Sequence, residues 1–174
     1  NNDINKKEFI KSKKIYFTNN LSKLSDCNVY IITVPTPIKK NNQPDLNYIK
    51  KACENIGPLL NKSDVVILES TVYPGVSEEF CVPILQSKSR LKYNEDFFFG
   101  YSPERINPND SKHKITNIKK ITSGSNAKTA TFVDKLYKKI IKVGTFKVDD
   151  IKIAEAAKVI ENAQRDINIA FMNE

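Results

Sequence analysis

Three short segments combine hydroxyl or charged side chains with a proline or glycine that shapes a turn. They are Pro35-Thr36-Pro37, Ser70-Thr71-Val72-Tyr73-Pro74-Gly75 and Ser102-Pro103-Glu104-Arg105-Ile106-Asn107-Pro108. Hydroxyl and charged groups of this kind bind polar ligands and transfer protons, and loops often carry such functions. Any one of these segments could be an ordinary turn. Three of them together favour a binding or catalytic site.

A fourth set of polar residues lies near the end of the chain. Lys158, Asn162 and Arg165 recur at steps of four and three, which places them on one side of a helix. A grouped set of polar side chains of this kind is a candidate for a binding or catalytic site. The alternative is a solvated face joined by intrahelical ion pairs. An apolar stripe predicts packing on the opposite side, through Ile153, Ala156, Ala157, Ile160, Ala163, Ile167 and Phe171.

The elements that must position these groups follow from the hydrophobic pattern. Short β-rich runs alternate with longer helical ones, which is typical of an α/β domain with a mostly parallel sheet. Strands are predicted at 14–17, 29–34, 65–69, 97–101, 120–122 and 146–148. Helices are predicted at 3–12, 45–60 behind an Asp45 N-cap, 77–87, 126–141, and from 149 or 150 onward. Ligands of such sheets bind beyond the carboxyl ends of the strands, where the three turns occur.

Length and composition exclude several classes of protein. With 174 residues, 40% hydrophobic and 28% charged, the chain suits one globular domain. No apolar run could span a membrane and no secretory signal is present, so we expect a cytoplasmic protein. Three scattered cysteines, expected to be packing residues, and one histidine predict no metal site. The net charge of +8 comes mainly from dispersed lysines, so a basic nucleic-acid-binding module is the weaker alternative to an anionic small-molecule substrate.

The motifs together resemble those of the UDP-glucose/GDP-mannose 6-dehydrogenases. Within that family they resemble most the bacterial enzymes that oxidise UDP-N-acetylhexosamines to uronic acids for surface-polysaccharide synthesis. The resemblance rests on the three turns with the preceding Val34, Glu69 and Tyr101, and on the helix from Lys158 through Asn162 to Asn173-Glu174. It covers nearly all of the chain. The Pro-Glu-Arg form at 103–105 favours the N-acetylhexosamine branch and leaves glucosamine, galactosamine and mannosamine sugars open.

This resemblance implies NAD as cofactor, a UDP-sugar as substrate, and a role for each matched residue. Thr36 and Thr71 match threonines that contact NAD, with Thr71 near the nicotinamide and the reacting sugar. Glu104 matches an acidic residue that acts near the sugar and activates water. Lys158 matches the lysine that stabilises oxyanionic intermediates or moves protons, with Asn162 beside it. The implied substrate contacts are Arg105, Ile106, Asn162 and Arg165.

Two motifs of the family have no match in this sequence. The five glycines are isolated, so no G-x-G-x-x-G turn is present to receive the NAD pyrophosphate at a helix N-terminus. No cysteine matches the family's nucleophile. The sequence therefore predicts an incomplete Rossmann-like, doubly wound parallel sheet followed by the start of a long central helix.

In this interpretation residues 1–148 form a partial NAD-binding domain, and residues 149–174 begin a helical region that makes a homodimer in the intact protein. We expect no nucleic-acid or membrane partner, and no activity from the 174-residue chain alone. The alternative function is a non-catalytic remnant that binds nucleotide or pairs with a full-length homologue.

Overall fold

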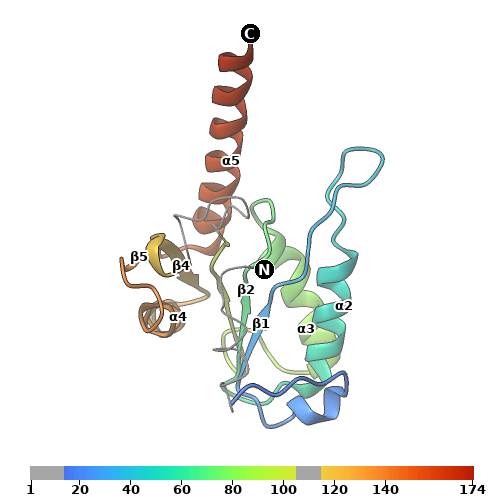
Figure 1. The fold of residues 1–174 in the computed structure, drawn as a ribbon. Helices are drawn as coiled ribbons and strands as arrows, with labels where there is room; N and C mark the ends of the chain where they lie inside the picture. The colour runs from blue at the N-terminus through green and yellow to red at the C-terminus, as the bar shows by residue number, and fades with distance from the viewer. Residues whose placement is uncertain (1–13, 105–114) are drawn as a thin grey trace.

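A five-stranded sheet forms the centre of the computed structural model, which describes residues 14–104 and 115–174 (Figure 1). Its strands follow the order of the chain: β1 (Val29–Ile32), β2 (Val65–Leu68), β3 (Phe98–Tyr101), β4 (Lys120–Gly124) and β5 (Thr145–Lys147). The pairs β1–β2, β2–β3 and β4–β5 are parallel, whereas β3 and β4 are antiparallel. The predicted α/β class with a mostly parallel sheet is confirmed.

The helices lie on both faces of this sheet (Figure 1). They are α2 (Asn47–Ile56), α3 (Val82–Ser89), α4 (Ala127–Lys138) and the long α5 (Ile151–Asn173), with a π-helical turn η3 (Val76–Cys81) running directly into α3. Short 3-10 turns complete the described elements: η1 (Leu21–Leu24), η2 (Gly57–Leu59) and η4 (Ile115–Asn117). Asp45 accepts a hydrogen bond from the N–H of Asn47 at the start of α2. The helix predicted at 3–12 lies outside the described residues.

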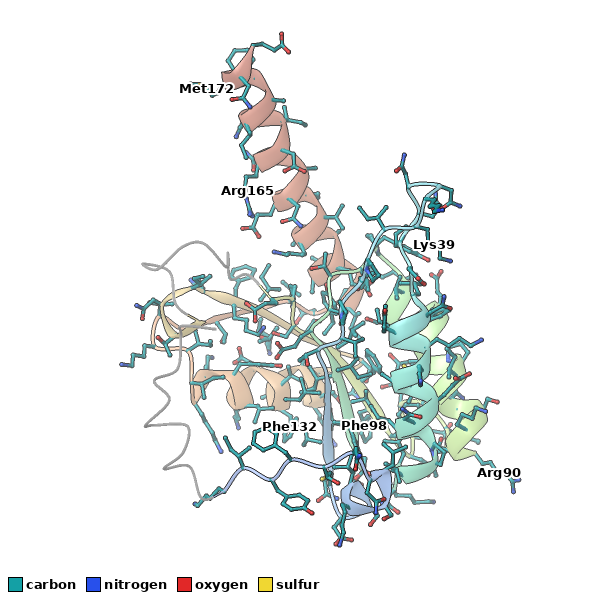
Figure 2. The ribbon with its side chains drawn as sticks, turned by 45° about the vertical axis from the view of Figure 1, so that its right-hand side comes forward. Lys39, Arg90, Phe98, Phe132, Arg165 and Met172 are labelled. Carbon is teal, nitrogen blue, oxygen red and sulfur yellow. The ribbon has the colours of Figure 1, made fainter. Side chains whose placement is uncertain are left out.

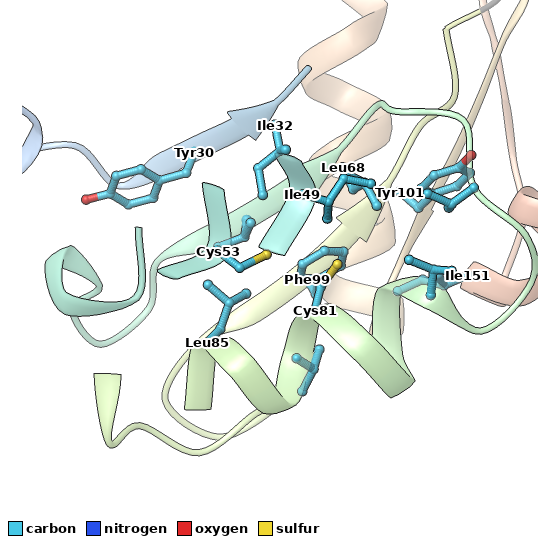
Figure 3. Packing of buried hydrophobic residues seen from close by; sticks show 14 of the residues in the cluster. Tyr30, Ile32, Ile49, Cys53, Leu68, Cys81, Leu85, Phe99, Tyr101 and Ile151 are labelled. Atoms are coloured by element: carbon cyan, nitrogen blue, oxygen red, sulfur yellow. The ribbon is translucent and has the colours of Figure 1, made fainter. Parts of the chain in front are cut away.

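β2 is buried on both faces, and its alternating side chains enter two separate cores. Val66 and Leu68 pack with α2, η3 and α3, where Ile49, Cys53, Cys81 and Leu85 are fully buried (Figure 3). Val65 and Ile67 pack on the other side against Val133, Tyr137 and Ile141, in and just after α4. Cys27 packs against the edge of the first core, so all three cysteines are packing residues as predicted.

Close packing of α4 on the sheet depends on a glycine at the end of β4. A Cβ on Gly124 would come within 2.3 Å of the backbone nitrogen of Ala130, a contact that no larger residue could make. The helix therefore approaches β4 closely, and this positions Asp134 and Tyr137 beneath the strand ends.

The strand predicted at 14–17 is wrong. Residues 15–18 have no regular secondary structure, and Ile15 and Tyr16 are exposed. A strand needs a neighbour that pairs with its N–H and C=O groups. In the described part of the sheet β1 is an edge strand that pairs with β2 alone, so the run Lys14-Ile15-Tyr16-Phe17 is not sufficient to make a strand.

The long C-terminal helix is confirmed, but its predicted orientation is wrong. Its buried residues are Ile151, Ala154, Glu155 and Lys158, all in the first two turns. Ile153, Ile160, Ile167 and Phe171 of the predicted apolar stripe are exposed instead. Only the beginning of α5 packs on the sheet, and the remainder projects from the body of the protein (Figures 1 and 2). None of the helices in residues 14–104 and 115–174 has the length and apolar character of a membrane span.

Candidate functional site

A pocket of about 350 Å³ lies at the carboxyl ends of β1 and β2, beside the segment that follows β3. It brings together Thr36, Thr71 and Glu104, three of the residues that the sequence predicts for a site. Its full lining is Thr33, Val34, Pro35, Thr36, Glu69, Ser70, Thr71 and Glu104. The carboxyl ends of parallel strands meet at one edge of a sheet, and this edge is where doubly wound folds bind ligands.

Hydrogen bonds between neighbouring strand ends fix the walls of the pocket. The Ser70 hydroxyl donates to the carbonyl of Val34 at 2.6 Å, which joins the turns after β1 and β2. The N–H of Glu104 donates to the carbonyl of Glu69 at 3.2 Å, which joins the turns after β2 and β3. Ser102 adds a bond from its hydroxyl to the carbonyl of Ile121 at 2.7 Å. The backbone around the pocket is thus held without a ligand.

One hydroxyl of the pocket is buried and unsatisfied. Thr36 Oγ1 has no hydrogen-bond partner among the described residues, whereas Thr71 is exposed. Buried polar groups are almost always hydrogen-bonded, because an unpaired one costs about 1–3 kcal/mol. A polar ligand in the pocket would satisfy this hydroxyl.

A buried lysine anchors the segment that carries Glu104. Lys120 is 4% exposed, and its Nζ lies 3.1 Å from the carbonyl oxygens of both Ser102 and Pro103. The same Nζ is 3.5 Å from a carboxylate oxygen of Glu69 and 4.9 Å from the ring centroid of Tyr137. The Tyr137 hydroxyl donates to the other Glu69 oxygen. Three elements that are distant in sequence thus meet directly below the pocket.

Burial is the largest influence on the pKa values of Lys120 and Tyr137. Burial lowers the pKa of the Lys120 ammonium, and the charges of Glu69 and Glu104 oppose that change. Burial and the neighbouring Glu69 both raise the pKa of Tyr137, so its hydroxyl stays protonated and continues to donate. Sequence reasoning missed Lys120 and Tyr137. The available signal was Glu69, a carboxylate at the end of a fully buried strand, which requires a cationic or donor partner.

The polar residues of α5 lie near the pocket's side of the sheet but do not line it. Lys158 is buried and Asn162 is half-buried. Arg165 donates to Asn162 Oδ1 at 3.4 Å and pairs with Glu161 at 3.5 Å, both contacts within its own helix. Figure 2 shows Arg165 on the projecting part of α5. The pocket is lined by strand-end residues, and no α5 residue of the described chain is among them.

Another residue of α5 connects the helix to the turn after β2. Glu155 is fully buried and accepts hydrogen bonds from the N–H groups of Gly75 and Ser77. Arg105 and Ile106 lie outside the described residues. Within residues 14–104 and 115–174 no group of three or more His, Cys, Asp or Glu could hold a metal ion.

Comparison with known proteins places the chain in a family. The family model described as "UDP-glucose/GDP-mannose dehydrogenase family, NAD binding domain" matches residues 4–141. UDP-N-acetyl-D-glucosamine 6-dehydrogenases of Salmonella typhi and Pseudomonas aeruginosa are 55% and 56% identical over 174 and 172 residues. These alignments cover 100% and 99% of this chain and 41% of each relative, so the chain spans about two fifths of their length.

A solved structure has the same fold. The UDP-D-ManNAc dehydrogenase from Pyrococcus horikoshii superimposes with a TM-score of 0.82 at 32% identity, over 90% of this chain and 37% of that one. The sheet and its flanking helices are therefore Rossmann-like, and the long helix α5 follows them. Because the family model covers most of the sequence, this chain belongs to the UDP-glucose/GDP-mannose dehydrogenase family, and residues 4–141 match its NAD-binding domain.

Proposed function

We propose that the protein oxidises the C6 alcohol of UDP-N-acetylglucosamine to the uronic acid, with NAD as oxidant. The reaction consumes one water and two NAD⁺ and yields the carboxylate, two NADH and protons. The single observation that carries the proposal is the strand-end pocket, which Thr36, Thr71 and Glu104 line together. The buried Thr36 hydroxyl there has no hydrogen-bond partner among the described residues. The glucosamine sugar is chosen because two relatives at 55% and 56% identity carry that activity in their names.

The pocket fits the nicotinamide end of NAD, which supplies the hydride acceptor of the reaction when bound. Thr36 would satisfy its buried hydroxyl on the cofactor, and the exposed Thr71 hydroxyl would contact it from the neighbouring strand end. This pocket does not account for binding of the NAD pyrophosphate. The sequence contains no G-x-G-x-x-G turn, so these residues do not supply the usual phosphate cradle.

The remaining residues are assigned to proton transfer and substrate binding. Glu104, half-buried at the pocket, would orient the water that is consumed in the second oxidation. Lys158 would stabilise the oxyanion that develops on the sugar, a role suited to a cation in a site from which water is excluded. Asn162 would assist it, and the sugar nucleotide would be bound by Arg105, Ile106, Asn162 and Arg165.

The test is an assay of the protein as its gene encodes it. NAD is supplied with UDP-N-acetylglucosamine, UDP-N-acetylgalactosamine, UDP-N-acetylmannosamine or UDP-glucose, and NADH is measured by absorbance. We expect two NADH per UDP-N-acetylglucosamine, with kcat/KM at least about tenfold above the other sugars. Preference for another N-acetylhexosamine would correct the sugar, and no NADH from any of the four would overturn the proposal. The 174-residue chain alone, assayed in parallel, should form no NADH.

A further inference from the structure

Glu155 is a charged side chain with no exposure to solvent. One carboxylate oxygen lies 2.6 Å from the backbone nitrogen of Gly75, and the other lies 2.9 Å from that of Ser77. Burial raises the pKa of Glu155, and these donors oppose that change. A buried carboxylate without hydrogen-bond donors would destabilise the folded protein, so both bonds contribute to its stability.

The two N–H groups belong to the beginning of η3, which follows the Thr71 turn of β2. The first N–H groups of a helix have no partner inside it and favour a negative charge. Gly75 directs the chain into this helix with a φ of +100°, a conformation that favours glycine. Glu155 therefore caps η3 from a separate helix, 80 residues further along the chain than Gly75.

This cap has consequences for both elements that it joins. The start of η3 is filled by an internal carboxylate, so it is not a place for a ligand phosphate. On α5, Glu155 and Lys158 are three residues apart, which puts them on adjacent turns of the same side, and both are buried. Holding Glu155 sets the rotation and the axial position of the turn that carries Lys158.

We propose that Glu155 is a positioning residue that holds Lys158 of α5 and Thr71 of the β2 turn in one fixed arrangement. The proposal rests on the proposed function, in which these two residues serve the sugar oxyanion and the nicotinamide. Only three residues of chain separate Thr71 from Gly75, so a displaced η3 would move Thr71. The same displacement would release the first turns of α5.

The chain supplies a matched control for this contact. Lys152 of α5 and Glu79 of η3 form an exposed ion pair of 2.6 Å that joins the same two elements without reaching the backbone of the turn. Removing Glu79 weakens the general attachment of α5 to η3. Removing Glu155 takes away the cap itself.

The test compares Glu155→Gln with Glu79→Gln in the protein as its gene encodes it. Glutamine keeps the size of the side chain, but its NH₂ group faces one backbone N–H, so one cap bond is lost. We expect kcat to fall about tenfold in Glu155→Gln while KM for NAD and sugar changes less than about threefold, the signature of a lost transition-state arrangement. Glu79→Gln should stay within about twofold of the wild type.

A second measurement separates positioning from simple destabilisation. If Glu155 acts through Thr71 as well as Lys158, then Glu155→Gln should lower kcat less in a Thr71→Ala background than in the wild type, because part of its effect is already lost there. Multiplicative losses would overturn the proposal, as would wild-type kcat in Glu155→Gln. If Glu155→Gln does not fold, Glu155→Asp replaces it in the test. Aspartate keeps the charge but is one methylene too short to reach both N–H groups, so a wild-type kcat in Glu155→Asp would also overturn the proposal.

Hydrogen exchange gives a readout that needs no activity. The amides of Gly75 and Ser77 should exchange at least about tenfold faster in Glu155→Gln than in the wild type, and no faster in Glu79→Gln. Unchanged exchange would overturn the cap. If the two variants differ in exchange as predicted but the wild-type protein makes no NADH, the cap is supported and the proposed function is not.

Discussion

In the proposed function, the Thr36 hydroxyl links the stability of the protein to NAD binding. It is buried at the pocket and lacks a hydrogen-bond partner among the described residues. Replacing it with an isosteric methyl should remove an energetic penalty from the free protein and a contact from the bound one. Thr36→Val should therefore raise the unfolding free energy without NAD by about 1 kcal/mol and weaken NAD binding about fivefold.

Calorimetric titration with NAD and urea unfolding measure the two halves of this prediction. Thr131→Val is the control, since the Thr131 hydroxyl already bonds to Ala127 within α4. A Thr36→Val protein that is less stable, yet binds NAD normally, would show that the hydroxyl has a structural role only.

Lys120 should matter to stability far more than exposed lysines do. Lys120→Met leaves Glu69 without its cation and the carbonyls of Ser102 and Pro103 without their donor. We expect a loss of about 3 kcal/mol of unfolding free energy. Lys92→Met, which breaks an exposed pair with Glu95, should cost less than about 1 kcal/mol in the same urea titration. Equal losses would contradict the role assigned to the buried group.

Sequence reasoning found the pocket residues but not their supports. Thr36, Thr71 and Glu104 follow strands, and the rule that strand ends meet at one edge brings them together. Lys120, Tyr137 and Glu155 bond to groups 17 to 80 residues away, contacts that exist only after the chain has folded. A local pattern cannot show such partners.

At the scale of elements, Asp134 joins α4 to the edge of the sheet. Its carboxylate accepts hydrogen bonds from the hydroxyls of Thr122 on β4 and Thr145 on β5, and it pairs with Lys138 at 2.7 Å. Burial alone would raise the pKa of Asp134, but Lys138 and the two hydroxyls outweigh it and hold the pKa below its ordinary value. The folded protein therefore favours the ionised form.

This lowered pKa predicts a pH dependence of stability. The contribution of Asp134 is present above its unfolded pKa of about 4 and is lost as the pH falls through the lower folded value. Asp134→Asn should cost about 1–3 kcal/mol near neutral pH, and the difference from the wild type should shrink below about pH 4. Urea unfolding across pH checks it, with Glu95→Gln at an exposed site as control. A difference independent of pH would contradict the assignment.

Buried elements were predicted well and exposed ones poorly. β2 is apolar throughout because helices cover both of its faces, so its sequence identifies it as a buried strand. The segment 14–17 has a similar apolar pattern but no paired strand in the described residues, and pairing is not encoded in one run. On α5 the apolar stripe predicted which side of the helix packs on the sheet. The side that packs is instead the one where Glu155 accepts hydrogen bonds from Gly75 and Ser77.

For the whole molecule, the exposed stripe of α5 predicts self-association. Ile160 and Phe171 are 65% and 80% exposed on a helix that projects from the body of the protein (Figure 1). An apolar surface of this extent on one element is typical of an interface. We expect the protein to be a homodimer through α5 and Ile160→Asp with Ile167→Asp to give a monomer in sedimentation equilibrium. Dimers that persist in the double variant would place the interface elsewhere.

We propose that the pocket at the strand ends is the NAD side of a sugar-oxidising site. A crystal structure of the protein as its gene encodes it, with NAD and UDP-N-acetylglucosamine bound, tests this most directly. We predict the nicotinamide between Thr36 and Thr71, a hydrogen bond from Thr36 Oγ1 to the cofactor, and the sugar C6 facing Glu104 and Lys158. A cofactor bound away from these strand ends, with Thr36 still unpaired, would show that the pocket is not the NAD site.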